Sequence, residues 1–264
     1  MAEMRPEVDQ ASDKLLARLE RGERQGLETE FKHLLEQHPD YHMTNYAMGV
    51  YVGMVQNDPV AAIPFFEKAV RVFPPLAEAH YNLGSAYVKA AHVAAAVAAY
   101  RNAIRHSNGA DGIDEKARER LRELEQIIRD TSPFSTLEAY IENQKLFDQA
   151  FESLKEQRYE QAVELFKKVL EQQPEHVQSY GNLALAQAGL GHKAAALASL
   201  DKALALDPAY EPARNNRIVI ANMIEGKPFI PPMFAETEYY REKLEAEKSG
   251  TSRWRQKLHF WKRG

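Results

Sequence analysis

The chain has 264 residues, 44% hydrophobic and 27% charged with a net charge of −4, which is the composition of a globular protein. It contains no cysteine, and this excludes disulfides, thiolate metal sites and a cysteine nucleophile. The longest mostly apolar stretch, residues 90–100, is short of the ~20 residues of a bilayer span, and the acidic start lacks a secretory pattern, so we expect a cytoplasmic protein.

One spacing of apolar and small residues recurs along the chain. In each copy an apolar helical period runs for about 12 residues, stops, and restarts after a glycine or polar turn, which predicts two short helices. The copies lie at 8–41, 42–76, 77–110, 143–176 and 177–210. No single copy can bury its apolar face alone, so neighbouring copies are expected to stack.

Three positions of each copy explain the spacing. Small residues let the second helix approach the first closely, and larger residues four positions later fill the wedge between copies; a trailing proline ends the second helix. The small residues are Ala62, Ala96, Ala162 and Ala196, the larger ones are Phe66, Tyr100, Phe166 and Leu200, and the prolines are Pro39, Pro74, Pro174 and Pro208.

These residues resemble the tetratricopeptide repeat, a 34-residue helix-turn-helix unit with small residues near positions 8, 20 and 27 and proline near 32. The resemblance covers roughly 170 residues. It implies an all-α fold, a right-handed superhelical solenoid in which the first helix of each repeat lines an inner groove.

Departures from the repeat suggest two blocks. Pro64 should kink the second helix of the second copy, and residues 113–130 are predicted to form a capping helix that closes a first block. Ser135 to Glu138 has capping-box spacing and should start a helix that runs to about Glu156. A helix over 211–225 is expected to cap the second block. The predicted organisation is an N-terminal tail (1–7), two blocks (8–130 and 131–225), a proline-rich apolar segment with an acidic helix (226–250), and a basic aromatic tail (251–264).

The resemblance also indicates which residues could face a partner. On the inner wall, asparagines could clamp the backbone amides of an extended peptide, and apolar residues could form pockets. The candidates are Asn82, Asn182, Asn216, Tyr46, Tyr81 and Val50. The alternatives are that the asparagines only make local helix contacts and that the apolar residues are buried by the protein itself.

The C-terminal tail has a different character. Residues 251–264 hold five basic residues and no acidic one, whereas the rest has 29 basic and 38 acidic residues, a net charge of −9. If helical, Trp254, Leu258 and Trp261 share one face, next to cations that include Arg253 and Arg255. The tail could dock on the body or on a protein partner, or attach to a membrane surface or to nucleic acid.

The sequence gives no support for catalysis. Nucleophile-elbow, phosphate-loop and HExxH spacings are absent, and the nine histidines are scattered, so no catalytic residue, metal or cofactor is predicted. We therefore expect a non-enzymatic scaffold or adaptor that binds an extended peptide or partner helix. The alternative is an assembly factor tethered to a membrane or to nucleic acid by its tail, and a homo-oligomer stays open.

Overall fold

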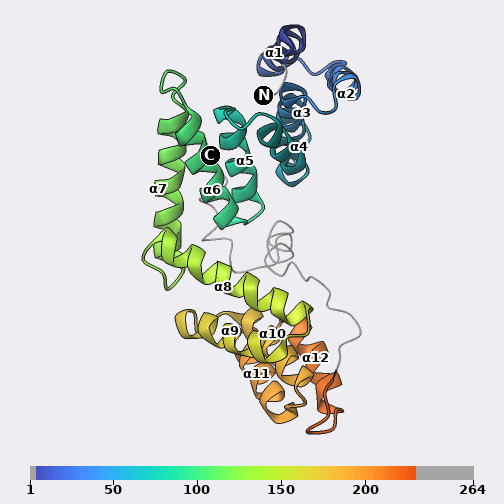
Figure 1. The fold of residues 1–264 in the computed structure, drawn as a ribbon, viewed down its shortest axis with the longest axis vertical. Helices are drawn as coiled ribbons and strands as arrows, with labels where there is room; N and C mark the ends of the chain where they lie inside the picture. Colours follow the sequence, from blue (N-terminus) through green and yellow to red (C-terminus); the bar gives the residue numbers. More distant parts are fainter. Residues whose placement is uncertain (1–3, 230–264) are drawn as a thin grey trace. The chain divides into compact units, whose positions relative to one another are not determined.

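The computed structural model describes residues 4–229, which form twelve α-helices and no strand (Figure 1). The chain divides into two compact units between Ile127 and Ile128, a division that falls inside one long helix. The tail residues Trp254, Leu258, Trp261, Arg253 and Arg255, the acidic helix and most of the apolar proline-rich segment lie outside the described residues.

Unit 1 contains three helical pairs and most of α7. Its helices are α1 (Pro6–Glu20), α2 (Leu27–Gln37), α3 (His42–Val55), α4 (Pro59–Val72), α5 (Ala77–Lys89), α6 (Val93–His106) and α7 (Ile113–Thr131). Unit 2 contains α8 (Leu137–Lys155), α9 (Tyr159–Gln172), α10 (Val177–Gly189), α11 (Lys193–Leu206) and α12 (Glu211–Ala221).

Each predicted copy is a pair of helices in contact. The pairs α3 with α4, α5 with α6, α8 with α9, and α10 with α11 each pack against one another, and successive pairs pack through α4 with α5 and through α9 with α10. Figure 1 shows these pairs as antiparallel helices within each unit. The predicted all-helical repeat solenoid is therefore confirmed.

The close approach of the two helices of a pair depends on small residues in the first helix. A Cβ atom added to Gly49 of α3 would lie 2.7 Å from the Phe66 ring of α4, and one added to Gly84 of α5 would lie 2.8 Å from the Tyr100 ring of α6. The repeated alanines and the larger residues that follow them are buried in all four pairs. The recurring spacing of small and large residues in the sequence is therefore required by the packing of the paired helices.

The turn inside each of these four pairs has one residue with a left-handed backbone. These residues are Asn57, Ala91, Gln157 and Gly191, with φ between 52° and 82°. Only the last is a glycine, so three of the turns carry a side chain in a conformation that L-residues rarely adopt. The turn geometry is thus preserved although its residue type is not.

The trailing prolines end the second helices as predicted. Each proline lies two residues beyond the last helical residue. The four residues that precede the prolines have φ between −133° and −137° and ψ between 61° and 96°, outside the helical region. This is the restriction that a following proline ring imposes.

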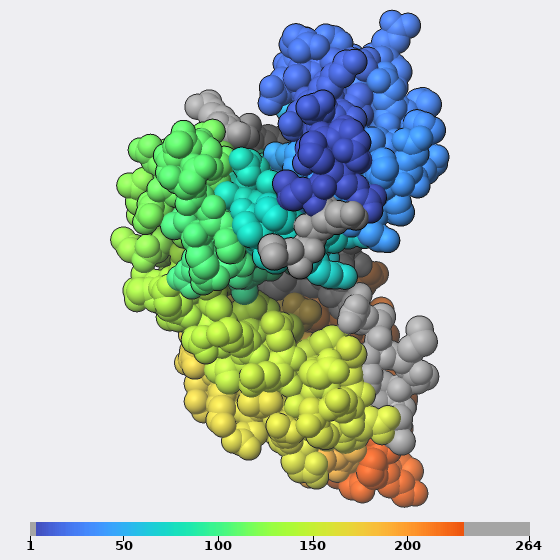
Figure 2. Space-filling model, turned by 45° about the horizontal axis from the view of Figure 1, so that its top comes forward, coloured from blue at the N-terminus to red at the C-terminus, as the bar shows by residue number. Residues whose placement is uncertain are grey.

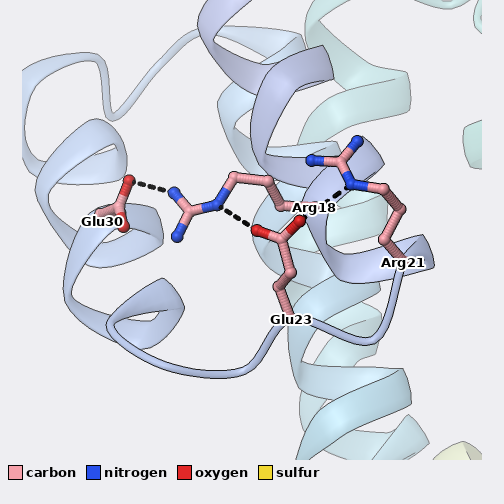
Figure 3. Close-up of polar contacts among 4 residues, drawn as sticks. All are labelled: Arg18, Arg21, Glu23 and Glu30. Atoms are coloured by element: carbon pink, nitrogen blue, oxygen red, sulfur yellow. Dashed lines mark hydrogen bonds and ion pairs between the residues drawn. The ribbon is translucent and has the colours of Figure 1, made fainter.

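The first helical pair is held by an arginine as well as by its apolar core. The Arg18 guanidinium of α1 bonds to Glu30 of α2 (2.7 Å) and to Glu23 of the connecting loop (3.1 Å), and Glu23 also accepts from Arg21 (Figure 3). The side chains of α1 and α2 pack side by side (Figure 2). Glu23 and Glu30 are therefore both paired with cations.

Two helix ends differ from the sequence prediction. The N-cap of α8 is Thr136 rather than Ser135: its Oγ1 accepts from the Ala139 amide at 3.2 Å, one residue later than the predicted capping box. The helix predicted over 211–225 ends at Ala221, because Asn222 and the following residues turn the chain toward α10 and α11. There the Gly226 amide donates to the Gly191 carbonyl (2.8 Å) and the Phe229 amide to the Ala188 carbonyl (2.9 Å).

Helix α12 differs from α3, α5, α8 and α10 on one face. At the position of Gly49 and Gly84, α12 carries Ile218, whose side chain is 67% exposed. The neighbouring Val219 is also exposed. The face that binds a second helix in the complete pairs therefore has a large side chain here.

The glycine contact predicts opposite effects for two matched substitutions. Gly84→Ala should destabilise unit 1 by about 1–3 kcal/mol, because the new methyl group overlaps the buried Tyr100 ring. Gly53→Ala is the control: its Cβ would lie 3.7 Å from Ala62, an ordinary contact, so it should stabilise α3 by about 0.5–1 kcal/mol. Urea unfolding measures both, and a Gly84→Ala protein as stable as the Gly53→Ala protein would contradict the packing account.

A buried histidine lies in the core of unit 2. The His176 ring packs edge-on against Phe147 with 5.1 Å between ring centroids, and its Nδ1 lies 2.6 Å from Ser179 Oγ. Burial lowers the pKa of His176 to about 4. Burial also lowers the pKa of His42 and of His80 in unit 1. All three rings are therefore held in the neutral form.

This burial predicts a loss of stability in mild acid. In the unfolded chain His176 takes up a proton with a pKa of about 6.5, which is above its pKa in the folded protein. The contribution of the neutral ring to the free energy of unfolding is therefore complete above this pH and is lost as the pH falls toward 4. Between pH 7 and 5 the unfolding free energy should decrease by about 2 kcal/mol from this group. His176→Gln should reduce this pH dependence, and His192→Gln, on an exposed turn of the same unit, should not. Identical pH profiles for the two variants would refute this account.

Candidate functional site

Unit 1 has a hollow on the side formed by its first helices. We call it the unit 1 hollow; its volume is about 310 Å³. It is lined by residues of α1, α3 and the start of α5: Asp13, Leu16, Ala17, Glu20, Met43, Tyr46, Leu76 and Glu78. The three helices are the inner helices of successive repeats, so the hollow lies on the predicted groove wall.

Two of the predicted site residues meet at this hollow. Asn82 of α5 donates a hydrogen bond from Nδ2 to the hydroxyl of Tyr46 on α3, at 3.3 Å. The Tyr46 ring is half-buried, with its centroid 6.2 Å from that of Phe66. Since an amide has two N–H donors and one acceptor, Asn82 keeps a donor and its carbonyl oxygen for other contacts.

The electrostatic surroundings of Tyr46 are negative. Burial, followed by the negative charges of Glu78, Glu20 and Asp13, raises the pKa of Tyr46 to about 12. The tyrosine therefore stays neutral and can act as a hydrogen-bond donor as well as an acceptor. Three carboxylates from α1 and α5 thus act on one phenol.

The other two candidates of unit 1 lie in different surroundings. The Tyr81 ring is 5.7 Å from Tyr100, and its hydroxyl accepts a hydrogen bond from the Arg120 guanidinium of α7, which raises the pKa of Arg120. Val50 is half-buried and packs against the apolar core of the first three helices and their neighbours. Neither residue lines the unit 1 hollow.

The remaining asparagines lie in unit 2. Asn182 of α10 is 8% exposed, and its Nδ2 is buried without a hydrogen-bond partner among the described residues. Asn216 of α12 is half-buried, and α10 and α12 are in contact. An unpaired buried donor costs about 1–3 kcal/mol. Two of the three predicted asparagines are therefore on adjacent inner helices, and the third belongs to the other unit.

One aromatic residue of α8 is buried by unit 2 itself. Phe147 is 9% exposed and packs against Phe166 and His176, and the half-buried Phe151 stacks beside it with 6.4 Å between centroids. Phe147 therefore belongs to the core of unit 2, and Phe151 lies at the edge of that core.

Sequence reasoning missed the acidic lining of the unit 1 hollow. The signal is the spacing of Asp13, Leu16, Ala17 and Glu20, which places all four on one face of α1. Glu78, at the start of α5, completes the set only because the repeats stack. A search restricted to asparagine and aromatic residues could not find it.

The described part of the chain was compared with the requirements of a metal site and of a membrane-spanning helix. Within residues 4–229 no three histidine, aspartate or glutamate residues are close enough together to hold a metal ion. Over the same residues, no helix combines the length and the apolar character needed to cross a membrane.

Comparisons with known proteins agree with this architecture. The tetratricopeptide repeat family matches residues 54–111 and 147–211. A search of curated proteins finds no match. Similar solved structures include YrrB, described as a tetratricopeptide-repeat protein with an unusual peptide-binding site; it is 22% identical, with 71% of this chain and 97% of that chain covered and a TM-score of 0.35.

Two further structures are similar at comparable levels. The repeat domain of P58(IPK) is 14% identical over 81% of this chain and 64% of that chain, with a TM-score of 0.43. The TPR2AB domain of yeast Sti1, in a complex with pHSP90, is 18% identical over 81% and 83%, with a TM-score of 0.39.

The family match falls on the helical pairs whose small residues, buried rings and trailing prolines were found in the sequence and then in the structure. Residues 54–111 and 147–211 of this chain are tetratricopeptide repeats.

Proposed function

We propose that this protein is a non-enzymatic scaffold that binds an extended peptide or a helix of a partner protein on the inner helices of its repeats. Tetratricopeptide repeats are in general interaction modules without catalytic activity. Their stacked helices create extended concave surfaces, which repeat proteins use for binding.

The observation that carries the proposal is the unit 1 hollow. It lies across three inner helices, its volume is near the lower end of the ~300–1,000 Å³ of ligand pockets, and its apolar lining includes Tyr46, which is bonded to Asn82. A space of this size fits one or two side chains of a longer ligand. Peptide recognition commonly combines such pockets with hydrogen bonds to the peptide backbone.

The inner helices of unit 2 support a second contact area. Asn182 has an amide donor that no described residue accepts from, and Asn216 lies on the adjacent helix. A ligand carbonyl that reached Asn182 after a rotation of its side chain would remove the cost of the unpaired donor. Backbone carbonyls of an extended peptide have the required chemistry.

The test uses the full chain with the paired substitution Asn182→Ala/Asn216→Ala. Affinity purification from the native cells, followed by mass spectrometry, identifies partners of the unchanged protein, and titration of the purified partner measures the affinity. The double variant should bind about thirtyfold more weakly, because each of the two lost hydrogen bonds contributes roughly 1 kcal/mol and about 1.4 kcal/mol corresponds to a factor of ten.

The matched control is Asn102→Ala on the outer helix α6, where the asparagine oxygen accepts only a local bond from Arg105. Its affinity should equal that of the unchanged protein. If the double variant retains its fold and binds its partner undiminished, the asparagines have no part in recognition.

A further inference from the structure

The unit 1 hollow combines an apolar lining with an acidic one. Five of its lining residues are apolar or aromatic, and Leu16, Met43 and Leu76 are half-buried. The other three are Asp13, Glu20 and Glu78, and no lysine, arginine or histidine lines the hollow. A ligand that fills this space therefore meets apolar surface and negative charge together.

The three carboxylates have no cationic partner in residues 4–229. None of them forms an ion pair or side-chain hydrogen bond with a described residue. Two other acids of the α1–α2 pair differ, since Glu23 and Glu30 are both bonded to Arg18 (Figure 3). The carboxylates of the hollow are therefore available to a ligand.

The three carboxylates of the hollow all affect the same residue, Tyr46. Glu78, Glu20 and Asp13 each add to the rise in the pKa of Tyr46, so their fields converge at its hydroxyl although they come from two helices. Like charges that converge raise the free energy of the unliganded protein, and a cation brought among them lowers it. Charge complementarity of this kind speeds association and selects the partner.

We infer that the unit 1 hollow binds a segment of a partner protein in which lysine or arginine residues lie next to apolar side chains. The apolar side chain enters the space between α1, α3 and α5, and the cations pair with Asp13, Glu20 and Glu78. The inference rests on the proposed scaffold function and specifies the chemistry of its partner.

The experiment measures binding of three labelled synthetic peptides to the full chain by fluorescence anisotropy. The peptides share one leucine and phenylalanine pattern and carry four lysines, four glutamines or four glutamates at the same positions. The lysine peptide should bind at least tenfold more tightly than the glutamate peptide. Its affinity should fall as salt is raised from 50 to 300 mM, since exposed charges are screened over about 8–10 Å near physiological salt.

Charge variants locate the binding site. Asp13→Asn/Glu20→Gln/Glu78→Gln removes the three charges with little change in shape and should weaken the lysine peptide about tenfold or more. The control Glu36→Gln/Glu115→Gln/Glu119→Gln removes three exposed charges from α2 and α7 of the same unit, and should change its affinity less than twofold. Equal affinity for the lysine and glutamate peptides, or equal effects of the two triple variants, would overturn the inference.

Two further arms distinguish charge recognition from purely apolar binding and from binding of the chain's own tail. The glutamine peptide could bind as tightly as the lysine peptide and be weakened by Leu16→Ala/Met43→Ala. In that case the inference about charge fails and the proposed peptide-binding function survives. If no variant of the hollow changes the affinity of any peptide, the inference about charge and the proposed peptide-binding function both fail for the unit 1 hollow.

A variant of the tail tests binding by the chain's own residues. The full chain with Arg253→Gln/Arg255→Gln/Lys257→Gln should bind the lysine peptide with unchanged affinity. A tenfold higher affinity of this tail variant for the lysine peptide would mean that the basic tail competes for the hollow. That result would overturn the inference that the hollow binds a partner protein.

Discussion

The architecture depends on the contact between a buried side chain of the second helix and a small residue of the first helix in four of the helical pairs. In unit 1 the rings of Phe66 and Tyr100 lie where a Cβ atom on Gly49 or Gly84 would be, so the two helices pack at a distance that only glycine allows. In unit 2 the equivalent residues are buried alanines, Ala150 and Ala184. This approach lets the two helices of each pair pack closely, and the stacked pairs then bring their first helices into contact, as α3 with α5 and α8 with α10.

The two units carry chemically different inner surfaces on the same scaffold. On the inner helices of unit 1 the polar groups are carboxylates around a neutral tyrosine, whereas on those of unit 2 they include the buried amide of Asn182 and the half-buried amide of Asn216. The residues that fix the fold are all on the faces between helices and leave the inner positions free to differ. One chain can therefore present two kinds of contact without a change in its core.

The fold could be predicted from the sequence because its determinants are local and repeated. Ala96, Tyr100 and their counterparts recur at fixed spacing, and each proline acts on the residue directly before it. The site was less accessible to sequence reasoning. The hydrogen bond between Arg120 and Tyr81 depends on the position of the inserted helix α7 against α5. The presence of Glu78 and Asp13 in the same hollow depends on the stacking of one repeat on the next. The early end of α12 at Ala221 likewise reflects tertiary hydrogen bonds of the next residues to the turn at Gly191.

Ile218 of α12 has a consequence for the length of the array. A second helix of the usual kind would bring an aromatic ring to the position that this isoleucine occupies, as Tyr100 does at Gly84. A helix added after α12 with the spacing of α5 and α6 would therefore clash with Ile218. Growth of the solenoid in that direction would require a smaller residue there, or the packing of the first pair, which accommodates Leu15 at the same repeat position. The residue at this position thus limits how closely a further helix could approach α12 if the array lengthened during evolution.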